Sequence, residues 1–396
     1  MNRKIFRRGM LCGILLSILL AGAFIFGRWI GSRAQPNVLT DSRHVEKIKD
    51  LEYLIDKYYL EEKDEDSLAE GVYAGLLYGL GDPYSRYYTA EEYEEETVES
   101  EGNYMGIGVL IQKDENEAAN IEECYKGGPA DLAGILAGDE IVAIDGVDIF
   151  EKNITETVEL IKSELEKTVV LSIRREGEVE LLEFSVTVDH VKIPSVEYEM
   201  LENQVGYIRI TEFKGVTPEQ YENALRELDR QGMEKLIVDL RNNPGGLLSS
   251  VCDVLQQMLP EGLIVYTEDK YGEREEYTCE NDHAFDRPLV VLVNENSASA
   301  SEIFAGAIQD YGLGTIVGKT TYGKGIVQAI KEFWDGSAIK LTVSKYFTPK
   351  GQDIHEVGIK PDVEVDQDLE VGGLDDVPHE KDTQLLRALE ILADIN

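Results

Sequence analysis

The sequence contains few of the residues that build metal sites, disulfide frameworks or nucleic-acid-binding surfaces. It has 4 cysteines and 5 histidines among 396 residues, and no two cysteines are spaced Cys-x-x-Cys. This pattern predicts neither a structural zinc site nor a disulfide framework. Only 38 residues are basic against 77 acidic ones, and the resulting formal net charge of −39 repels nucleic acid. We therefore expect no metal, no cofactor and no nucleic-acid partner.

The N-terminal segment has the pattern of a membrane anchor. Basic residues within positions 3–8 precede 19 uncharged residues, 9–27, which as a helix would span about 28 Å. The basic flank is expected in the cytoplasm and the rest of the chain outside. A secretory signal is the alternative, because Ser32-Arg33-Ala34 resembles a small-x-small cleavage site. The protein would then be secreted after cleavage behind Ala34.

The C-terminal half alternates predicted strands and helices. Helical stripes of apolar residues at 45–60 and 68–80 come first, well before this region. One helix of the alternating region is predicted to begin at Thr217, with Pro218 in its first turn and a capping box completed by Gln220. The strand-like apolar runs lie at 206–210, 235–240, 289–293 and 315–317. This order predicts an α/β core.

Three polar residues with a chemical relationship follow the third of these runs. Ser299 comes shortly after it, Lys324 stands between two glycines, and Gln328 lies four residues further on. A serine hydroxyl becomes a nucleophile when a base removes its proton, and a desolvated lysine can be that base. Simpler interpretations exist, since Ser299 and Glu302 match a Ser-x-x-Glu capping box and a lysine between glycines is commonly solvated. Capping is compatible with catalysis, because a helix N-terminus favours the negative charge that develops during acyl transfer.

Lys324 must be neutral to accept a proton. Its ordinary pKa is about 10.4, and burial without a carboxylate partner can lower this by about three units. If 325–333 is a strand leading to a hairpin turn at Asp335-Gly336, Lys324 and Gln328 point to the same side. Gln328 can then hold the lysine amine without adding a charge that favours the ammonium form.

These residues resemble the motifs of the carboxyl-terminal processing (tail-specific) peptidases. The family pattern is a Ser-Ala-Ser-Ala-Ser-Glu helix start followed by Gly-Lys-Gly-x-x-Gln. The resemblance implies a crotonase-like, ClpP-like spiral core, a Ser299/Lys324 dyad assisted by Gln328, and oxyanion donors at the N–H groups of Gly245 and Ala300. It also implies a homodimer formed through terminal helical regions. Further matching segments occur in family order between residues 40 and 366, at 81–89, 239–246, 346–351 and 358–363.

Residues 101–189 resemble a PDZ domain. The loop Gly106-Ile107-Gly108 is similar to the glycine-flanked loop that binds a peptide carboxylate, and 128–146 matches protease-associated PDZ domains. Glycines let main-chain N–H groups approach the carboxylate while the peptide adds a strand. A bulged strand would also explain Gly106 and Gly108. Arg175 loosely matches a family arginine and is a further candidate for contact with the peptide C-terminus.

The sequence fits three other functions or mechanisms, and a nucleotide-binding loop, less well. None of the histidines lies in the serine or glycine-rich motifs, although a distant one could still complete a triad. A non-catalytic PDZ scaffold on a decayed protease fold would have no reason to keep Ser299, Lys324 and Gln328 together. A crotonase-type enzyme would need an adenine-binding loop, which nothing here resembles. The Gly-Lys-Thr at 318–320 is not a P-loop, because the required glycine at position 313 is Leu313.

The sequence therefore predicts a membrane-anchored, extracytoplasmic serine endopeptidase that recognises the free C-terminal tails of protein or peptide substrates through a PDZ domain and cleaves nearby. The fold class is multi-domain α/β, with a crotonase/ClpP-like protease core, an inserted mostly β PDZ domain, a helical N-terminal region and a transmembrane helix. The expected divisions are a basic tail, an anchor, a linker, a helical region, the PDZ domain, the protease core and an acidic helical tail, at 1–8, 9–27, 28–41, 42–100, 101–189, 190–366 and 367–396.

Overall fold

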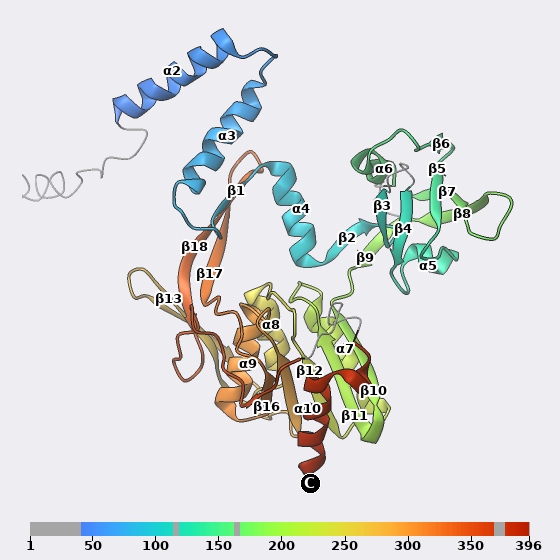
Figure 1. Cartoon of the computed structure of the whole chain (residues 1–396), viewed down its shortest axis with the longest axis vertical. Coiled ribbons are helices and arrows are strands. Elements are labelled where there is room, and N and C mark those ends of the chain that lie inside the picture. Colours follow the sequence, from blue (N-terminus) through green and yellow to red (C-terminus); the bar gives the residue numbers. More distant parts are fainter. Residues whose placement is uncertain (1–40, 114–118, 162–166, 368–376, 396) are drawn as a thin grey trace, which may run out of the picture. The chain divides into compact units, whose positions relative to one another are not determined.

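The computed structural model describes residues 41–113, 119–161, 167–367 and 377–395 (Figure 1). The chain divides into two compact units, one up to Val72 and one from Tyr73 onward. The predicted anchor at 9–27 lies outside the described residues. Within the described ranges, no helix is both long enough and apolar enough to cross a membrane.

The described residues of the first unit, 41–72, are mostly helical. Helix α2 (Ser42–Tyr58) is capped by the Asp41 carboxylate, which accepts from Arg43 N at 3.0 Å, and helix α3 (Glu65–Tyr78) begins in this unit. Both helices lie where the apolar stripes predict helices. Neither buries a residue in the single chain, and Leu51 and Tyr58 are among the exposed apolar side chains of α2.

A small β domain has its own hydrophobic core, formed by residues such as Ile121, Leu171 and Ile173. Strands β2 (Asn103–Gly106) and β9 (Asp189–Lys192) pair antiparallel, so the chain enters and leaves the domain side by side. Two short helices, α5 (Pro129–Ala133) and α6 (Ile154–Ile161), accompany the sheet. The sheet order is β3 (Val109–Lys113), β4 (Ala119–Cys124), β5 (Glu140–Ile144), β7 (Thr168–Arg174) and β8 (Leu182–Thr187), with β6 (Val147–Asp148) beside β5.

The α/β core is built on a second six-stranded sheet. Its strands are parallel except β10, and β15 is buried at every position because both faces of the sheet are covered. Alternate residues of β15 therefore belong to different clusters, Val291 on one face and Val290 on the other. The strand order is β10 (Val196–Leu201), β11 (Val205–Ile210), β12 (Lys235–Asp239), β15 (Leu289–Val293), β16 (Thr315–Gly318) and β19 (Val363–Glu364).

Helices cover both faces of this sheet (Figure 1). Helices α7 (Thr217–Arg230), α8 (Leu248–Gln256) and α9 (Ala300–Tyr311) contribute side chains to the larger cluster. On the opposite face, helix α10 (Thr383–Asp394) buries Leu385, Ala388 and Leu392. The C-terminal segment is therefore part of the core.

An antiparallel sheet adjoins the α/β core. Strand β17 (Ile326–Glu332) and strand β18 (Ala338–Phe347) form the predicted hairpin, closed by a hydrogen bond from Phe333 N to Ser337 O. Helix α4 (Ala90–Glu101) follows the first strand of this sheet. The strand order is β1 (Arg86–Tyr88), β18, β13 (Gly262–Asp269) and β14 (Arg274–Cys279), with β17 also paired to β18.

The start of α7 departs from the prediction. The helix begins at Thr217 with Pro218 in its first turn, but the capping box is wrong, because the residue before the helix is Val216, which makes no side-chain cap. The Thr217 hydroxyl instead accepts from Lys214 N at 2.8 Å, and the Gln220 side-chain oxygen accepts from Ser195 N at 2.8 Å. The Thr217 side chain is therefore engaged by the chain just before the helix, and the Gln220 side chain by a residue 25 positions away.

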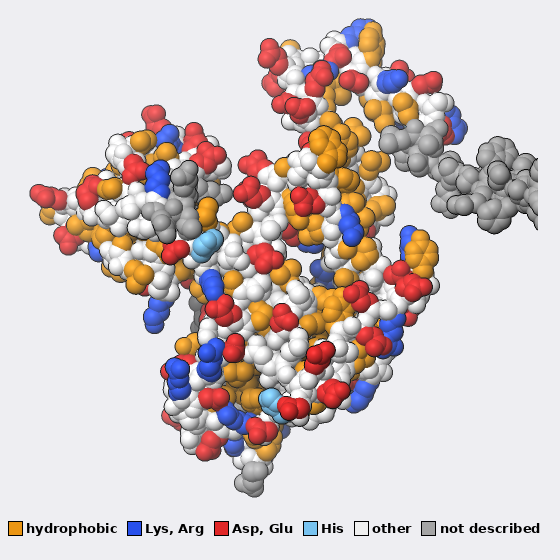
Figure 2. Space-filling view, turned by 180° about the vertical axis from the view of Figure 1, so that it is seen from behind, with side chains coloured by type: hydrophobic (Ala, Val, Ile, Leu, Met, Phe, Trp, Pro, Cys, Tyr) orange, Lys and Arg blue, Asp and Glu red, His pale blue; other side chains and the backbone are white. Residues whose placement is uncertain are grey.

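The surface shows the acidic excess of the sequence. Asp and Glu side chains are spread over the face seen in Figure 2 rather than gathered in one patch. Among the residues that the structure describes, no group of three or more His, Cys, Asp or Glu could hold a metal ion. Cys252 and Cys279 are buried free thiols, and Cys124 is a half-buried one.

Candidate active site

Ser299 lies between β15 and α9 in a backbone conformation that serine rarely adopts. Its φ is 54° and its ψ is −113°. Such a conformation costs on the order of 1–3 kcal/mol and persists only where the surroundings impose it. Here the preceding loop is held by Ser297, whose hydroxyl accepts from Asn294 N at 2.9 Å and donates to Leu240 O at 2.7 Å. The loop and the buried first turn of α9 therefore determine the position of Ser299.

The Glu302 carboxylate connects Ser299 to the segment that carries Lys324. It is fully buried, and one oxygen accepts from the N–H groups of both Ser299 and Lys324 at 2.8 Å. The other oxygen accepts from Gly323 N at 2.7 Å and from the Thr321 hydroxyl at 2.6 Å. Burial raises the pKa of Glu302 above its ordinary value although these four donors oppose the rise. The sequence predicted only a helix cap at this residue.

Lys324 is half-buried between β16 and β17. Burial first, and the charge of Lys340 second, lower the pKa of Lys324, whereas Asp82 and Glu302 act in the opposite direction. The Lys324 ammonium lies 4.5 Å from the centroid of the Tyr84 ring. The environment therefore lowers the pKa in the direction that a lysine base requires.

Gln328 lies on β17, but its side chain does not take the partner that the sequence predicted. Its side-chain N–H donates to the Thr342 hydroxyl at 3.3 Å, and the hydrogen bonds of the described residues include none between Gln328 and Lys324. The pairing of β17 with β18 shifts register between Val327 and Gln328. Such an irregularity changes the direction of a side chain, which explains why strand alternation alone did not predict the partner of Gln328.

The loop after β12 brings Gly245 against Ser299. A Cβ atom at Gly245 would lie 2.7 Å from Ser299 Cβ and 3.0 Å from Ala300 N, so only glycine fits here. The Gly245 N–H donates to the Asn243 side-chain oxygen at 2.8 Å. The Ala300 N–H, at the first position of α9, has no acceptor among the hydrogen bonds of the described residues. The two predicted oxyanion donors are thus adjacent, and one of them already has an intramolecular acceptor.

Ser299, Ala300, Lys324 and Gln328 line one pocket of about 310 Å³. Lys340 and Glu96 also line it and form an ion pair at 2.6 Å. No histidine is among its lining residues in the described part of the chain. The pocket therefore contains a hydroxyl, a lysine with a lowered pKa and main-chain N–H groups, which are the groups that acyl transfer needs.

Tyr346 adds a buried hydroxyl to this pocket that the sequence did not single out. It donates to the Lys324 main-chain oxygen and lies near the Ser299 side chain. Burial first, then the Glu302 charge, raises the pKa of Tyr346, so it stays a neutral donor. The motif that contains it, 346–351, was recognised without a role for the tyrosine.

In the small β domain, the predicted carboxylate loop is folded back on the chain. Ile107 is buried, and its carbonyl accepts from Ala130 N at 2.8 Å, while Gly108 has a φ of 80° that favours glycine. The Tyr104 hydroxyl lies near the N–H groups of Gly108 and Val109, and burial raises the pKa of Tyr104 to about 12. Tyr104 is therefore a neighbour of the Gly108 amide, which the sequence assigned to a peptide carboxylate.

Arg175 is held within the same domain. Its guanidinium forms a bidentate ion pair with the buried Asp139 carboxylate at 2.7 Å and donates to Gly134 O at 2.9 Å. It also lies 5.3 Å from the centroid of the Phe184 ring. The structure thus gives Arg175 internal partners, and its contact with a peptide stays a prediction.

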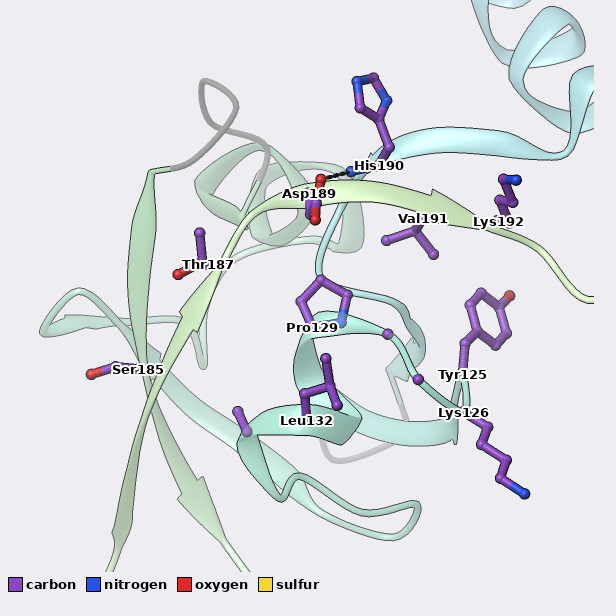
Figure 3. A pocket seen from close by; sticks show the side chains of 13 residues that line it. Tyr125, Lys126, Pro129, Leu132, Ser185, Thr187, Asp189, His190, Val191 and Lys192 are labelled. Atoms are coloured by element: carbon purple, nitrogen blue, oxygen red, sulfur yellow. Dashed lines mark hydrogen bonds between the residues drawn. The ribbon is translucent and has the colours of Figure 1, made fainter.

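A pocket of about 570 Å³ opens elsewhere in this domain (Figure 3). Tyr125 and Lys126 approach it from the turn before α5, and Asp189 and His190 from β9. The His190 N–H donates to the Asp189 carboxylate at 2.7 Å. None of the residues at 106–108 lines this pocket, but Tyr125, which does, donates its N–H to Gly108 O at 2.9 Å, so the pocket lies beside the predicted carboxylate loop.

Comparisons with known proteins connect this site to a family. Residues 204–365 match the model described as peptidase family S41, and 121–175 match a PDZ domain. Residues 30–92 match the N-terminal domain of the activating protease CtpB. The carboxyl-terminal-processing protease of Synechocystis sp. is 38% identical over 322 residues, which cover 80% of this chain and 75% of that protein.

The chain belongs to peptidase family S41. It is a carboxyl-terminal-processing serine protease with a PDZ domain, the small β domain described above. A probable CtpA-like serine protease of Staphylococcus aureus is 34% identical over 356 residues, covering 89% of this chain and 70% of that one. Among solved structures, the photosystem II D1 C-terminal processing protease is similar with a TM-score of 0.47 and 28% identity, covering 85% of this chain and 89% of that one.

Proposed function

We propose that this S41 protease cleaves peptide bonds with Ser299 as nucleophile and Lys324 as general base. The observation that carries the proposal is the buried Glu302 carboxylate, which accepts from the N–H groups of Ser299 and Lys324 together. One buried side chain thereby fixes the backbone of both residues. The lowered pKa of Lys324, due mainly to burial, supports the same assignment.

In the proposed reaction, neutral Lys324 takes the proton of the Ser299 hydroxyl as its oxygen attacks the scissile carbonyl carbon. The tetrahedral intermediate collapses when the carbon–nitrogen bond breaks, and the Lys324 ammonium returns the proton to the leaving amine. Water, deprotonated by Lys324, then attacks the acyl-enzyme ester. The bond between the acyl carbon and the Ser299 oxygen breaks as the Lys324 ammonium returns the proton to that oxygen, which releases the new C-terminus and restores the free enzyme. Each step moves one proton between Lys324 and the reacting atoms.

The oxyanion is proposed to bind the N–H groups of Gly245 and Ala300. Ala300 supports this role because its N–H is unpaired among the described residues and stands at the start of α9, where negative charge is favoured. At Gly245, the oxyanion would replace the Asn243 side-chain oxygen as acceptor. Gln328 is proposed to orient the Lys324 amine once its side chain leaves Thr342.

The PDZ domain is proposed to recognise the free C-terminal tail of a substrate. Gly106, Ile107 and Gly108 supply the carboxylate loop, with Arg175 as a further contact. A peptide carboxylate that binds the Gly108 amide would have to share this position with the Tyr104 hydroxyl or displace it. We further propose a single-pass anchor at 9–27 with the catalytic part outside the cell membrane, or secretion after cleavage behind Ala34. The exposed apolar side chains of α2 support a homodimer formed through the N-terminal helices.

Four variants test the dyad. Ser299→Ala and Lys324→Ala are each expected to abolish cleavage of a tailed peptide while the thermal unfolding profile is unchanged. Lys324→Arg should be equally inactive, because a guanidinium does not act as a base near neutral pH. Lys319→Ala is the matched control, since Lys319 is also a half-buried lysine but is paired with Asp366. Residual activity above about a tenth of wild type in Ser299→Ala or Lys324→Ala would reject the dyad.

A second comparison tests recognition of the substrate tail. Peptides that differ only in a C-terminal acid or amide should differ in kcat/KM by about tenfold to a hundredfold, the scale of one hydrogen bond to a charged group. Equal cleavage of the two peptides by the full chain would exclude carboxylate recognition. Absence of all turnover in the wild-type protein would instead favour the non-catalytic PDZ scaffold.

A further inference from the structure

Tyr84 makes a direct contact with the proposed base. The Lys324 Nζ atom lies 4.5 Å from the centroid of the Tyr84 ring, within the range in which an aromatic face attracts a cation. The described residues give Lys324 Nζ no hydrogen bond to Ser299 or to Gln328. The aromatic face is therefore an attractive contact of the ammonium, beside the more distant charges of Asp82 and Glu302.

Tyr84 is held in place by the turn in which it stands. The Asp82 carboxylate accepts from Tyr84 N at 3.0 Å and from the Ser85 hydroxyl at 2.6 Å. The Ser85 oxygen in turn accepts from Thr342 N on β18 at 3.1 Å, and Thr342 is the residue to which Gln328 donates. The turn thus contacts both Lys324 and the partner of Gln328.

The Tyr84 hydroxyl has a different neighbour. Burial first, and then the side chain of Tyr322, two residues before Lys324, raise the pKa of Tyr84. The ring and the hydroxyl of Tyr84 therefore have different neighbours. A substitution that removes only the hydroxyl leaves the contact with the ammonium in place.

We propose that Tyr84 is a positioning residue that holds Lys324 as an ammonium on its ring and so sets the pH above which the base becomes available. This inference rests on the proposed role of Lys324 in the dyad. The negative face of the ring stabilises the charged amine relative to the neutral one. Tyr84 thereby limits activity at low pH.

The other charged groups around Lys324 come from three elements. Lys340 on β18 disfavours the ammonium together with burial, whereas Asp82 in the turn and Glu302 on α9 favour it. Lys340 is itself paired with Glu96 of α4 at 2.6 Å. Removal of the ring takes away one of the stabilising contacts and leaves these groups in place, so the pKa of Lys324 should fall.

The test compares Tyr84→Leu, which removes the ring, with Tyr84→Phe, which keeps it and removes the hydroxyl. The acid limb of kcat/KM against pH reports the base of the free enzyme. In Tyr84→Leu this acid limb should move to lower pH by about half to one unit. At pH values below the wild-type midpoint of the limb, kcat/KM should therefore rise about threefold to tenfold. Tyr84→Phe should keep the wild-type limb. If Tyr84→Leu fails to fold, Tyr84→Met provides a second variant without a ring.

Three outcomes would overturn the inference. The acid limb of a folded ringless variant could stay where it is, Tyr84→Phe could shift as far as Tyr84→Leu, or a folded ringless variant could lose turnover altogether. Failure of the dyad itself looks different, because Lys324→Ala would then retain activity. An unshifted limb beside an inactive Lys324→Ala would reject the role of Tyr84 alone.

Discussion

The guanidinium of Arg241 forms a two-pronged ion pair with the Asp382 carboxylate, at 2.9 and 2.8 Å, although 141 positions separate the two residues in the chain. Both side chains are buried, and Asp239 contacts the same guanidinium. Arg241 directly precedes the loop that carries Gly245, and Asp382 is the residue that caps α10. The C-terminal segment therefore supports the loop next to the nucleophile.

Asp382→Asn is expected to lower the free energy of unfolding by about 2 to 4 kcal/mol, because part of the buried guanidinium charge loses its partner. It should also lower kcat/KM, since the loop that follows Arg241 loses an anchor. Denaturant unfolding and peptide cleavage measure the two effects. Glu390→Gln, on the exposed side of the same helix, is the control and should change stability by less than about 0.5 kcal/mol. Equal stability of the two variants would contradict the prediction.

Gly245→Ala should reduce kcat/KM by more than about a hundredfold, because its Cβ would collide with Ser299 and Ala300 and move the proposed oxyanion donors. Gly272→Ala is the matched control. Gly272 also has a positive φ, of 80°, but a Cβ there meets no atom within 4 Å. Comparing kcat/KM of the two variants separates the effect of the steric collision from the effect of placing a β-carbon on a residue with positive φ. Similar activity of the two variants would refute the role of the close contact at Gly245.

Glu302→Gln should reduce activity by about a hundredfold or more and lower stability by about 1 to 3 kcal/mol. A glutamine offers one acceptor oxygen, and its NH₂ group would face some of the four donors that now surround the carboxylate. Glu295→Gln, at an exposed position of the preceding loop, is the control. Wild-type kinetics in Glu302→Gln would show that the carboxylate does not position Ser299 and Lys324.

Arg175→Met should destabilise the PDZ domain by about 2 to 3 kcal/mol near neutral pH. Burial alone would raise the pKa of Asp139, but the Arg175 guanidinium and the Leu136 N–H outweigh it and the pKa is lowered. The ionised Asp139 therefore adds stability above its unfolded pKa of about 3.9, and this contribution disappears as the pH falls through the lower folded value.

Thermal unfolding of the wild type and of Arg175→Met across about pH 2 to 7 tests the direction of this pH dependence of stability. The difference between the two proteins should be largest near pH 7 and shrink in acid. Arg174→Met is the control, because Arg174 is a largely exposed neighbour paired with Glu140. A difference between wild type and Arg175→Met that does not change with pH would rule out the ion pair as its cause.

Local pattern predicted the elements that depend on neighbouring residues. The apolar run of β15, the Glu302 cap of α9 and the hairpin between β17 and β18 all follow from short-range rules. The same local rules failed at Thr217, whose hydroxyl accepts from Lys214 N just before the helix, and at Gln220, whose partner Ser195 lies 25 positions away. Local pattern cannot report such competition.

The sequence predicted the site residues whose chemistry can be recognised from residue type and spacing. It did not predict the residues whose role depends on contacts between distant parts of the chain. Ser299 and Lys324 share one pocket as expected. Tyr84 stands in a recognised motif, yet nothing in a sequence says that its ring meets a lysine 240 positions later at 4.5 Å. Asp382 gave no signal either, because an acidic residue in an acidic tail is indistinguishable from a solvated one until its partner is known.

The positive φ of Ser299 has a consequence for the history of this chain. Glycine adopts such a backbone conformation with less strain, so a glycine at position 299 would favour the fold and abolish the proposed chemistry. Selection for a stable protein alone would drift this position toward glycine. The serine at this position therefore carries a cost in stability that the proposed nucleophile requires.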